Sequence, residues 1–234
     1  MLAGARREVV DLSQPLGPRT VLWPGSHPVA VETVSEIDAD GSFGRVLRTP
    51  EHAGTHMDAP AHFVAGGRTV DAIPAAELVV EAAMIDAREA CARDPDHALD
   101  ANAIEAFEAE HGRLPHGGAL LVCTGWDRHR EDPARMLGGD RADDLRFPGF
   151  AASAGALVVE RGLAGLGIDT VSVDAGAATA YPVHRITLPA DLWHLEGLVN
   201  LDRLPARGAT IVIGVLPLAG GSGAPARVLA LVGD

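Results

Sequence analysis

The segment from Pro50 to Phe63, with the sequence PEHAGTHMDAPAHF, constrains the fold more than any other part of the chain. It places three histidines and one aspartate within eleven residues, with a glycine and a proline between them. The four donor side chains are His52, His56, Asp58 and His62. Any fold of this chain must accommodate several imidazole nitrogens and a carboxylate in one small region.

Backbone geometry excludes the two regular structures for the first three donors. On an extended strand they would share one face, but at about 3.3 Å per residue His52 and His56 would lie about 13 Å apart. Two ligands of one metal, each about 2.0–2.2 Å from it, must lie much closer together. A helix would turn Asp58 about 120° away from His52, and Gly54 and Pro60 disfavour a helix. We therefore expect a bent loop, with the turn at Gly54 and the exit at Pro60.

The donor types in this loop are typical of a metal site. A bound cation offsets the backbone entropy that is lost when a loop gathers its donors. Imidazoles with a carboxylate suit Zn²⁺, Mn²⁺ or Fe²⁺ better than Ca²⁺ or Mg²⁺. No cysteine lies near the loop, which disfavours a closed structural zinc site and favours a metal that activates water. The alternative is a polar surface loop that happens to hold three histidines.

The bulk properties exclude several classes of protein. The formal net charge of −13 argues against a nucleic-acid partner, whose phosphates require a basic surface. The first residues contain no apolar core of a signal peptide, and no apolar run approaches the roughly 18 residues of a membrane span. Cys91 and Cys123 lie in apolar runs and form no disulfide framework. We therefore expect two buried thiols in a cytoplasmic protein without a membrane partner.

The pattern along the chain predicts a mixed-sheet α/β fold in a single domain over residues 1–234, because no composition break marks a linker. We expect helices over 99–112, between Asp100 as N-cap and Gly112 as C-cap, and over 151–162. The expected strands are 7–13, 28–34, 43–50, the later part of 78–87, 118–125, 209–218 and 226–232, and residues 164–174 are expected to form a strand and the turn after it. Residues 126–150 read as a long polar loop that is functional or mobile.

Two further groups of residues have structural interpretations. Gly220, Gly221 and Gly223 favour a hairpin connection, because no Lys-Ser/Thr of a phosphate-binding loop follows them. Asp169 and Asp174 lie at the end of a predicted strand, where we expect them to form turns or to support site residues from behind.

The segment HAGTHMDAPAH resembles the signature His-x-Gly-Thr-His-x-Asp-x-Pro-x-His of the cyclase-type metal-dependent hydrolases. This family includes bacterial kynurenine formamidase and isatin hydrolase. Further segments resemble the family's other blocks and occur in the same order: VLWPGSHPV, LLVCTGW, GLGIDTVSVD, HLEGLVNL and LPLAGGSGAPARVLAL. One departure is Ala53, where the family pattern leads us to expect Thr or Ser.

The resemblance implies a fold of the swivelling β/β/α type, a homodimer or larger assembly, and one or two Zn or Mn ions per chain. By position, the ligands of a first metal are His52, His56 and Asp58. His184 and Glu196 match ligands of a second metal, with Asp58 and Glu196 able to bridge. We expect His194, two residues before Glu196, to be a surface residue or to support a ligand from behind.

The resemblance also implies a role for His62 as general acid/base and for Trp23 as an aromatic that packs on the substrate. The expected reaction is hydrolysis of a carbon–nitrogen amide bond in a small N-formyl arylamine or cyclic amide. Two alternatives stay open at this point. One is hydrolysis of a lactone or other cyclic ester at the same centre, and the other is a metal-stabilised binding protein without turnover.

Overall fold

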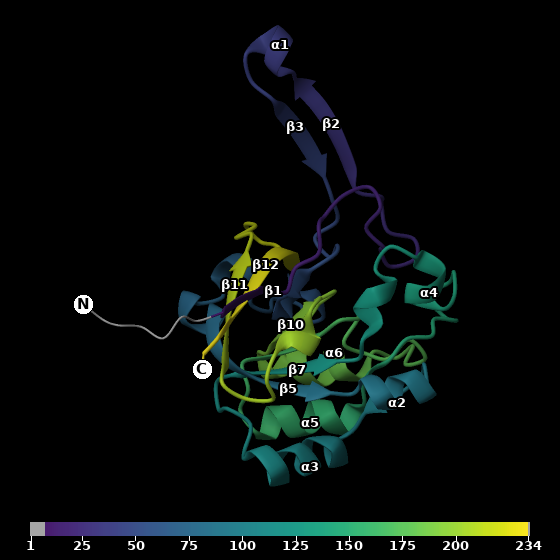
Figure 1. Ribbon diagram of the computed structural model, residues 1–234, viewed down its shortest axis with the longest axis vertical. Coiled ribbons are helices and arrows are strands. Elements are labelled where there is room, and N and C mark those ends of the chain that lie inside the picture. The colour runs from purple at the N-terminus through teal and green to yellow at the C-terminus, as the bar shows by residue number, and fades with distance from the viewer. Residues whose placement is uncertain (1–7, 234) are drawn as a thin grey trace, which may run out of the picture.

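A mixed sheet forms the centre of the computed structural model, which describes residues 8–233 (Figure 1). The strands of this sheet are β1 (Glu8–Asp11), β4 (His56–Asp58), β5 (Val79–Asp86), β7 (Ala119–Cys123), β9 (Gly165–Ile168), β10 (Trp193–Glu196), β11 (Ala209–Val215) and β12 (Gly223–Val232). Their order is β1-β12-β11-β5-β7-β9-β10-β4, and β4 also pairs with β12. Seven strands therefore close into a barrel-like ring, and β1 lies outside it against β12.

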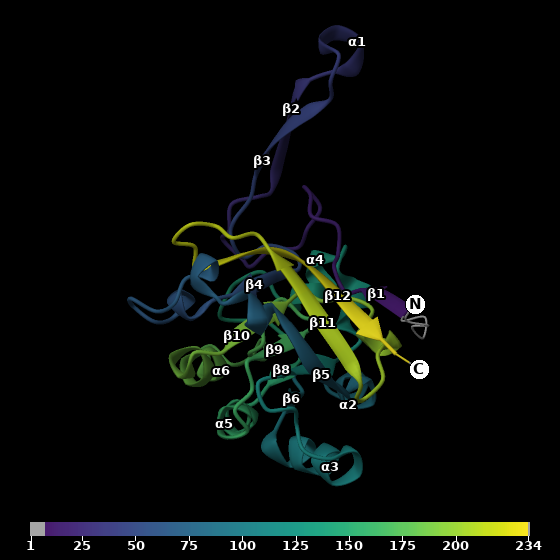
Figure 2. The same ribbon diagram turned by 90° about the vertical axis from the view of Figure 1, so that its left-hand side faces the viewer.

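The parallel part of the sheet carries helices on its outer face. Strands β5, β7, β9 and β10 run parallel to one another, and the other pairings are antiparallel. Helices α3 (Ala101–His111) and α5 (Ala152–Glu160) lie on this face (Figures 1 and 2). In β7, Leu120 packs towards the helices and Leu121 towards the inside of the ring. This alternation explains why β7 is apolar throughout, since both of its faces are buried.

The remaining elements are short. They are α1 (Ile37–Asp40), β2 (Ala30–Ser35), β3 (Gly44–Arg48), α2 (Arg88–Arg93), β6 (Ala98–Leu99), α4 (Pro133–Leu137), β8 (Gly149–Phe150) and α6 (Pro182–Thr187), together with six 3₁₀ helices in the described part of the chain. None of the helices in residues 8–233 combines the length and the apolar character that a membrane crossing requires.

Most predicted elements are confirmed, and the mixed α/β class is confirmed with them. The side chain of Asp100 accepts a hydrogen bond from the backbone N–H of Ala103 and caps α3, which ends at Gly112 as predicted. Both cysteines are buried. The glycine-rich segment after residue 218 connects the antiparallel strands β11 and β12, as expected of a hairpin connection.

The description of residues 126–150 as a long polar loop is wrong. This segment contains a 3₁₀ helix, α4 and β8. Its apolar residues Trp126, Met136, Leu137, Leu145 and Phe147 form a separate buried cluster with Val21. The error arises because these apolar residues lie at irregular spacings among many charges, so neither the helical nor the strand period appears.

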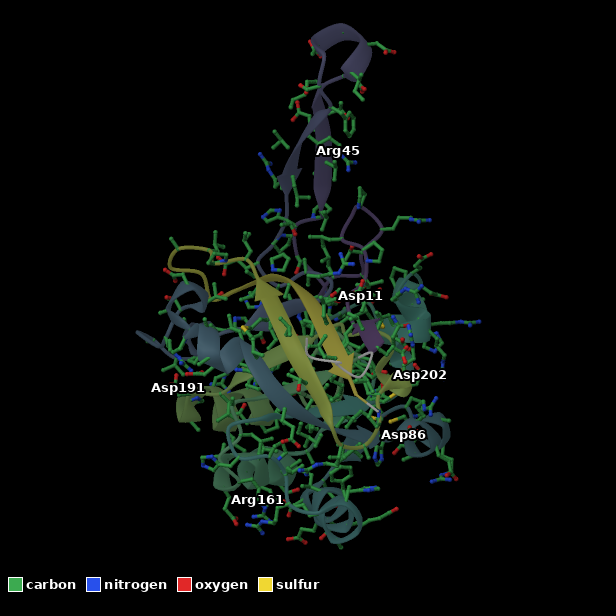
Figure 3. The ribbon with its side chains drawn as sticks, turned by 60° about the vertical axis from the view of Figure 1, so that its left-hand side comes forward. Asp11, Arg45, Asp86, Arg161, Asp191 and Asp202 are labelled. Atoms are coloured by element: carbon green, nitrogen blue, oxygen red, sulfur yellow. The ribbon has the colours of Figure 1, made fainter. Side chains whose placement is uncertain are left out.

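Strands β2 and β3 form a hairpin that projects far from the sheet (Figures 1 and 2). Neither strand contains a buried residue, and α1 at the tip contains none either. Figure 3 shows the side chains of the hairpin, Arg45 among them, standing clear of the rest of the chain. Apolar side chains such as Phe43 and Leu47 are therefore left in contact with water.

Candidate metal centre

Two short antiparallel strands, β4 and β10, present four donor side chains on one face. His56 and Asp58 are two residues apart on β4, and His194 and Glu196 are two residues apart on β10, so each pair shares a face. The register places Asp58 opposite His194 and His56 opposite Glu196. All four side chains are buried. The ladder between these strands therefore forms the floor of the candidate site.

His52 reaches this floor from the loop before β4. The backbone turns at Gly54, whose φ is +62°, and His52 Nδ1 lies 2.7 Å from Oδ1 of Asp58. A Cβ atom at Gly223 would lie 2.5 Å from Cε1 of His52. A glycine at this position lets β12 approach the imidazole. The predicted turn at Gly54 is confirmed.

The prediction of one continuous bent loop requires a correction, because His56–Asp58 forms strand β4. Strand pairing was missed because three residues are too few to show an alternating pattern. Pro60 begins a 3₁₀ helix, Pro60–His62, which ends the strand as expected of the exit residue. This turn brings His62 back over His52, with ring centroids 3.9 Å apart.

His184 enters from α6, more than a hundred residues downstream. Its Nδ1 lies 2.6 Å from Oδ2 of Asp174, and its Nε2 lies 3.3 Å from Oδ2 of Asp58. Asp174 also accepts hydrogen bonds from the backbone N–H groups of Val183 and His184. Asp174 therefore supports His184 from behind, which is one of the two expectations for it.

Asp169 serves another part of the structure. Its carboxylate accepts hydrogen bonds from the backbone N–H groups of Thr124, Gly125 and Trp126, and burial raises its pKa to about 6. Asp169 thus holds the start of the segment 126–150 against the end of β9.

The structure brings the predicted metal-site residues together in two groups that share Asp58. One group consists of His52, His56 and Asp58, and the other of Asp58, His184, His194 and Glu196. Within each group the donor atoms lie within 4.8 Å of one another. The expectation that His194 is a surface residue is wrong, because its side chain is 0% exposed. The signal that could have found it is its spacing of two residues from Glu196 on a strand.

Polar atoms without partners indicate where a cation fits. His56 Nε2, Asp58 Oδ2 and His194 Nδ1 are buried and have no hydrogen-bond partner among the described residues. Such atoms cost free energy when buried, unless another group satisfies them. Each of the two nitrogens belongs to a group of imidazole and carboxylate donors that includes Asp58, and such a donor set fits a divalent cation.

The titration of two histidines leads to the same conclusion. Burial works to lower the pKa of His56, but the carboxylates of Asp58 and Glu196, 3.3 and 3.4 Å from its Nε2, outweigh it and raise the pKa to about 10. Burial is likewise outweighed at His184, where the hydrogen bond to Asp174 and the nearby carboxylate of Asp58 raise the pKa to about 10. The buried carboxylates therefore attract positive charge strongly, and a divalent cation would provide it.

Hydrogen-bond acceptors behind the imidazoles of His56 and His184 determine which ring nitrogen faces the centre of the candidate site. The carbonyl oxygen of Gly54 can only accept, so His56 donates from Nδ1, at 3.0 Å, and Nε2 is the nitrogen that would release its proton to a cation. The carboxylate of Asp174 has the same effect on His184. Backing of this kind is typical of histidines that bind metals.

His62 has a different environment from the other histidines of the segment. None of the described residues forms a hydrogen bond with its ring, and it lines a cavity of about 410 Å³. Burial lowers the pKa of His62 to about 4, so the ring is neutral near pH 7. It is therefore able to accept a proton from a molecule in the cavity.

Aromatic side chains form the cavity wall that faces the donors. Trp23, Phe63 and Tyr181 all line it. The ring centroids of Trp23 and Tyr181 are 6.0 Å apart, and those of Phe63 and Tyr181 are 5.8 Å apart. Phe147 packs edge-on against Trp23, at 6.3 Å between centroids, so the segment 126–150 supports this wall. The cavity suits a small planar molecule with one polar edge.

Known protein sequences provide relatives for almost the whole chain. An isatin hydrolase of Roseibium aggregatum is 34% identical and covers 96% of this chain and 92% of its own length. A kynurenine formamidase of Salinibacter ruber is 28% identical and covers 94% of this chain and 96% of its own length.

Solved structures agree with the sequence relatives. An isatin hydrolase bound to the product analogue thioisatinate superposes with a TM-score of 0.92 at 32% identity, covering 97% of this chain and 93% of that one. Isatin hydrolase A from Ralstonia solanacearum gives a TM-score of 0.88 at 36% identity, covering 97% and 92%. The sequence model described as putative cyclase matches residues 10–175. The chain therefore belongs to the putative cyclase family, as the resemblance of its histidine-rich segment indicates.

Proposed function

We propose that this chain is a metal-dependent hydrolase that cleaves the carbon–nitrogen bond of a small amide, with a cyclic aryl amide such as isatin as the preferred class. One observation carries the proposal. A buried cluster of imidazoles and carboxylates opens into an aromatic cavity of about 410 Å³. The cavity is also lined by the imidazole of His62, which belongs to neither donor group.

The ligands that we assign are His52, His56, Asp58, His184 and Glu196. Imidazole and carboxylate donors accept both Zn and Mn, and we expect one or two ions per chain. When bound, such a cation lowers the pKa of water towards 7 and polarises a carbonyl group. The partnerless atoms His56 Nε2 and Asp58 Oδ2 support this assignment.

We assign proton transfer to His62. In hydrolysis, the oxygen of water forms a bond to the amide carbon, the carbon–nitrogen bond breaks, and the nitrogen gains a proton. The neutral ring of His62 takes the proton from water and gives it to the departing nitrogen. The place of His62 in the cavity lining, beside His52, supports this role.

The aromatic wall favours an aryl substrate. Trp23 and Phe63 present apolar ring surface, on which a planar aryl group can pack. Relatives named isatin hydrolase share a higher identity with the chain than the relative named kynurenine formamidase, at 34% against 28%. This difference supports a cyclic amide over an N-formyl arylamine.

A panel of four substrates tests the proposal. Protein reconstituted with Zn²⁺ or Mn²⁺ is mixed with isatin, N-formylkynurenine, a cyclic imide and a lactone, and the products are identified by mass spectrometry. We expect ring opening of isatin, which chelation of the metal abolishes. Turnover of the lactone alone would identify a cyclic-ester hydrolase instead. A metal-loaded protein that turns over none of the four would favour a metal-stabilised binding protein over the proposed hydrolase.

The proposed assembly is a homodimer held by the β2–β3 hairpin. An isolated two-stranded hairpin is marginally stable in water, and this one exposes apolar side chains, with Phe43 at 55% and Leu47 at 51%. A surface of this kind is typical of a protein interface. In the sequence, the hairpin lies between the cavity-lining residues Ser26 and Pro50, so its base adjoins the cavity. A two-fold dimer is the commonest assembly that satisfies both copies at once.

A further inference from the structure

We propose that His194 is a metal ligand through Nδ1, and that with Asp58, His184 and Glu196 it forms a closed position beside the open position of His52, His56 and Asp58. This inference rests on the metal dependence that is proposed above. It adds a ligand, and it divides the centre into an ion that is held and an ion that is available to substrate.

The position of His194 is the first argument. The side chain is completely buried, and the register of β4 and β10 places it directly opposite Asp58. Its Nδ1 lies 3.7 Å from Oδ2 of Asp58, and its ring meets the ring of His184 edge-on at 4.8 Å between centroids. His194 therefore points at the same space as the two residues that we already assign as ligands.

The hydrogen bonds of Thr187 identify the protonated nitrogen of His194. Oγ1 of Thr187 lies 2.7 Å from the carbonyl oxygen of Val183 and 2.7 Å from Nε2 of His194. The hydroxyl has one hydrogen, and two oxygens at this distance require a hydrogen between them. Thr187 therefore donates to Val183 and accepts from the Nε2–H of His194. Nδ1 is left with a lone pair that faces the centre.

A purely structural role for His194 leaves that lone pair unexplained. Nδ1 has no hydrogen-bond partner among the described residues, and Oδ2 of Asp58, the facing atom, has none either. A lone pair and a carboxylate oxygen that face each other repel, and burial without a partner adds a desolvation cost. A cation between Nδ1 of His194 and Oδ2 of Asp58 would remove both the repulsion and the desolvation cost, because both atoms would then contact a positive charge.

The number of protein ligands separates the two positions. Asp58, His184, His194 and Glu196 supply four, which is the full coordination of a structural zinc site. His52, His56 and Asp58 supply three, which leaves room for water or substrate. His52, with 25% of its side chain exposed, lines the cavity, whereas His194 does not. The closed position would hold its ion, and the open position would carry the chemistry.

Metal counting tests the inference without any substrate. Wild type and His194→Phe are reconstituted with Zn²⁺, dialysed with and without a chelator, and analysed by elemental mass spectrometry. We expect wild type to retain about one ion per chain that resists the chelator, and His194→Phe to lose it. His111→Phe is the matched control, since His111 is exposed and lies outside both groups. Circular dichroism compares the folding of all variants.

A second variant keeps the test decisive if His194→Phe does not fold. Thr187→Val retains the imidazole but removes the acceptor that orients it, and such changes typically weaken metal binding by about 10–100-fold. Unchanged metal content and unchanged chelator resistance in the folded variants would overturn the role of His194 and would leave the proposed function standing. A wild type that binds no metal after reconstitution would instead overturn the proposed function itself.

Discussion

Oδ2 of Asp174 accepts a hydrogen bond of 2.6 Å from Nδ1 of His184, and the same carboxylate accepts from the backbone N–H of His184. Asp174 thus determines both the position of the imidazole and the nitrogen that it presents to Asp58. A carboxylate behind a histidine in this way raises its basicity as a ligand and limits its rotation.

The first prediction concerns this pair. Asp174→Ala should lower metal affinity and kcat/KM by about 10–100-fold, because His184 loses the group that orients it. Asp174→Asn keeps an acceptor oxygen and should recover part of the loss. The measurements are a chelator competition and steady-state kinetics at saturating metal. If Asp174→Ala lowered thermal stability alone, with metal affinity unchanged, the positioning role would be wrong.

The second prediction separates proton transfer from metal binding. His62→Ala should retain the metal content of wild type, because the ring lies outside both donor groups. Turnover should fall by about 10²–10⁴-fold, which is the usual contribution of a general acid/base. Metal content and kcat are measured on the same sample. Full turnover in this variant would remove His62 from the mechanism.

The third prediction concerns the aromatic wall. Trp23→Ala should raise KM for an aryl substrate more than it lowers kcat, because the ring binds the aryl group and takes no part in bond cleavage. Trp23→Phe preserves an apolar ring, so its KM should lie between those of Trp23→Ala and wild type. A change confined to kcat would show that Trp23 acts on the reaction rather than on binding.

The fourth prediction concerns pH and the scaffold. Glu108 accepts hydrogen bonds from Nε and Nη2 of Arg161, which lies near the end of the molecule opposite the hairpin (Figure 3). These hydrogen bonds lower the pKa of Glu108 below its ordinary value of 4.5. A lowered folded-state pKa contributes stability above the unfolded pKa, and this contribution is lost as pH falls through the folded pKa.

Glu108→Gln should therefore reduce the free energy of unfolding by about 1.5–3 kcal/mol at pH 7, since the lost hydrogen bonds involve charged groups. The difference from wild type should shrink as pH falls below about 4.5. Denaturant titrations at several pH values measure it. Glu105→Gln, on the exposed side of α3, is the control and should change stability little. A difference that stays constant with pH would contradict the assigned ion pair.

The fifth prediction concerns assembly. The double variant Val46→Asp with Leu47→Asp should convert the proposed dimer into a monomer, because it places charge on the two exposed apolar residues of β3. Sedimentation velocity measures the mass in solution. Val9→Asp, at a position of similar exposure on β1, should leave the assembly unchanged. A wild type that sediments as a monomer would refute the dimer.

Local patterns predicted the elements that have local causes. The cap of Asp100 on α3 and the positive φ of Gly54 follow from side-chain chemistry within a few residues. Strand β7 was predictable because its apolar run is long enough to read alone. Strands β4 and β10 were not, because each has only three or four residues and gains its stability from its neighbours in the sheet.

By itself, the sequence determined which donors are available and that some of them gather around a turn at Gly54. It determined the family as well, since the motif from His52 to His62 is long and specific. Only the tertiary structure decided that His194 faces Asp58, that Thr187 and Asp174 orient the imidazoles, and that residues 126–150 support the cavity wall. The physical reason is that the register between strands, and the closure of the sheet into a barrel-like ring, bring together residues that are far apart in the chain. No local period in the sequence encodes such pairings.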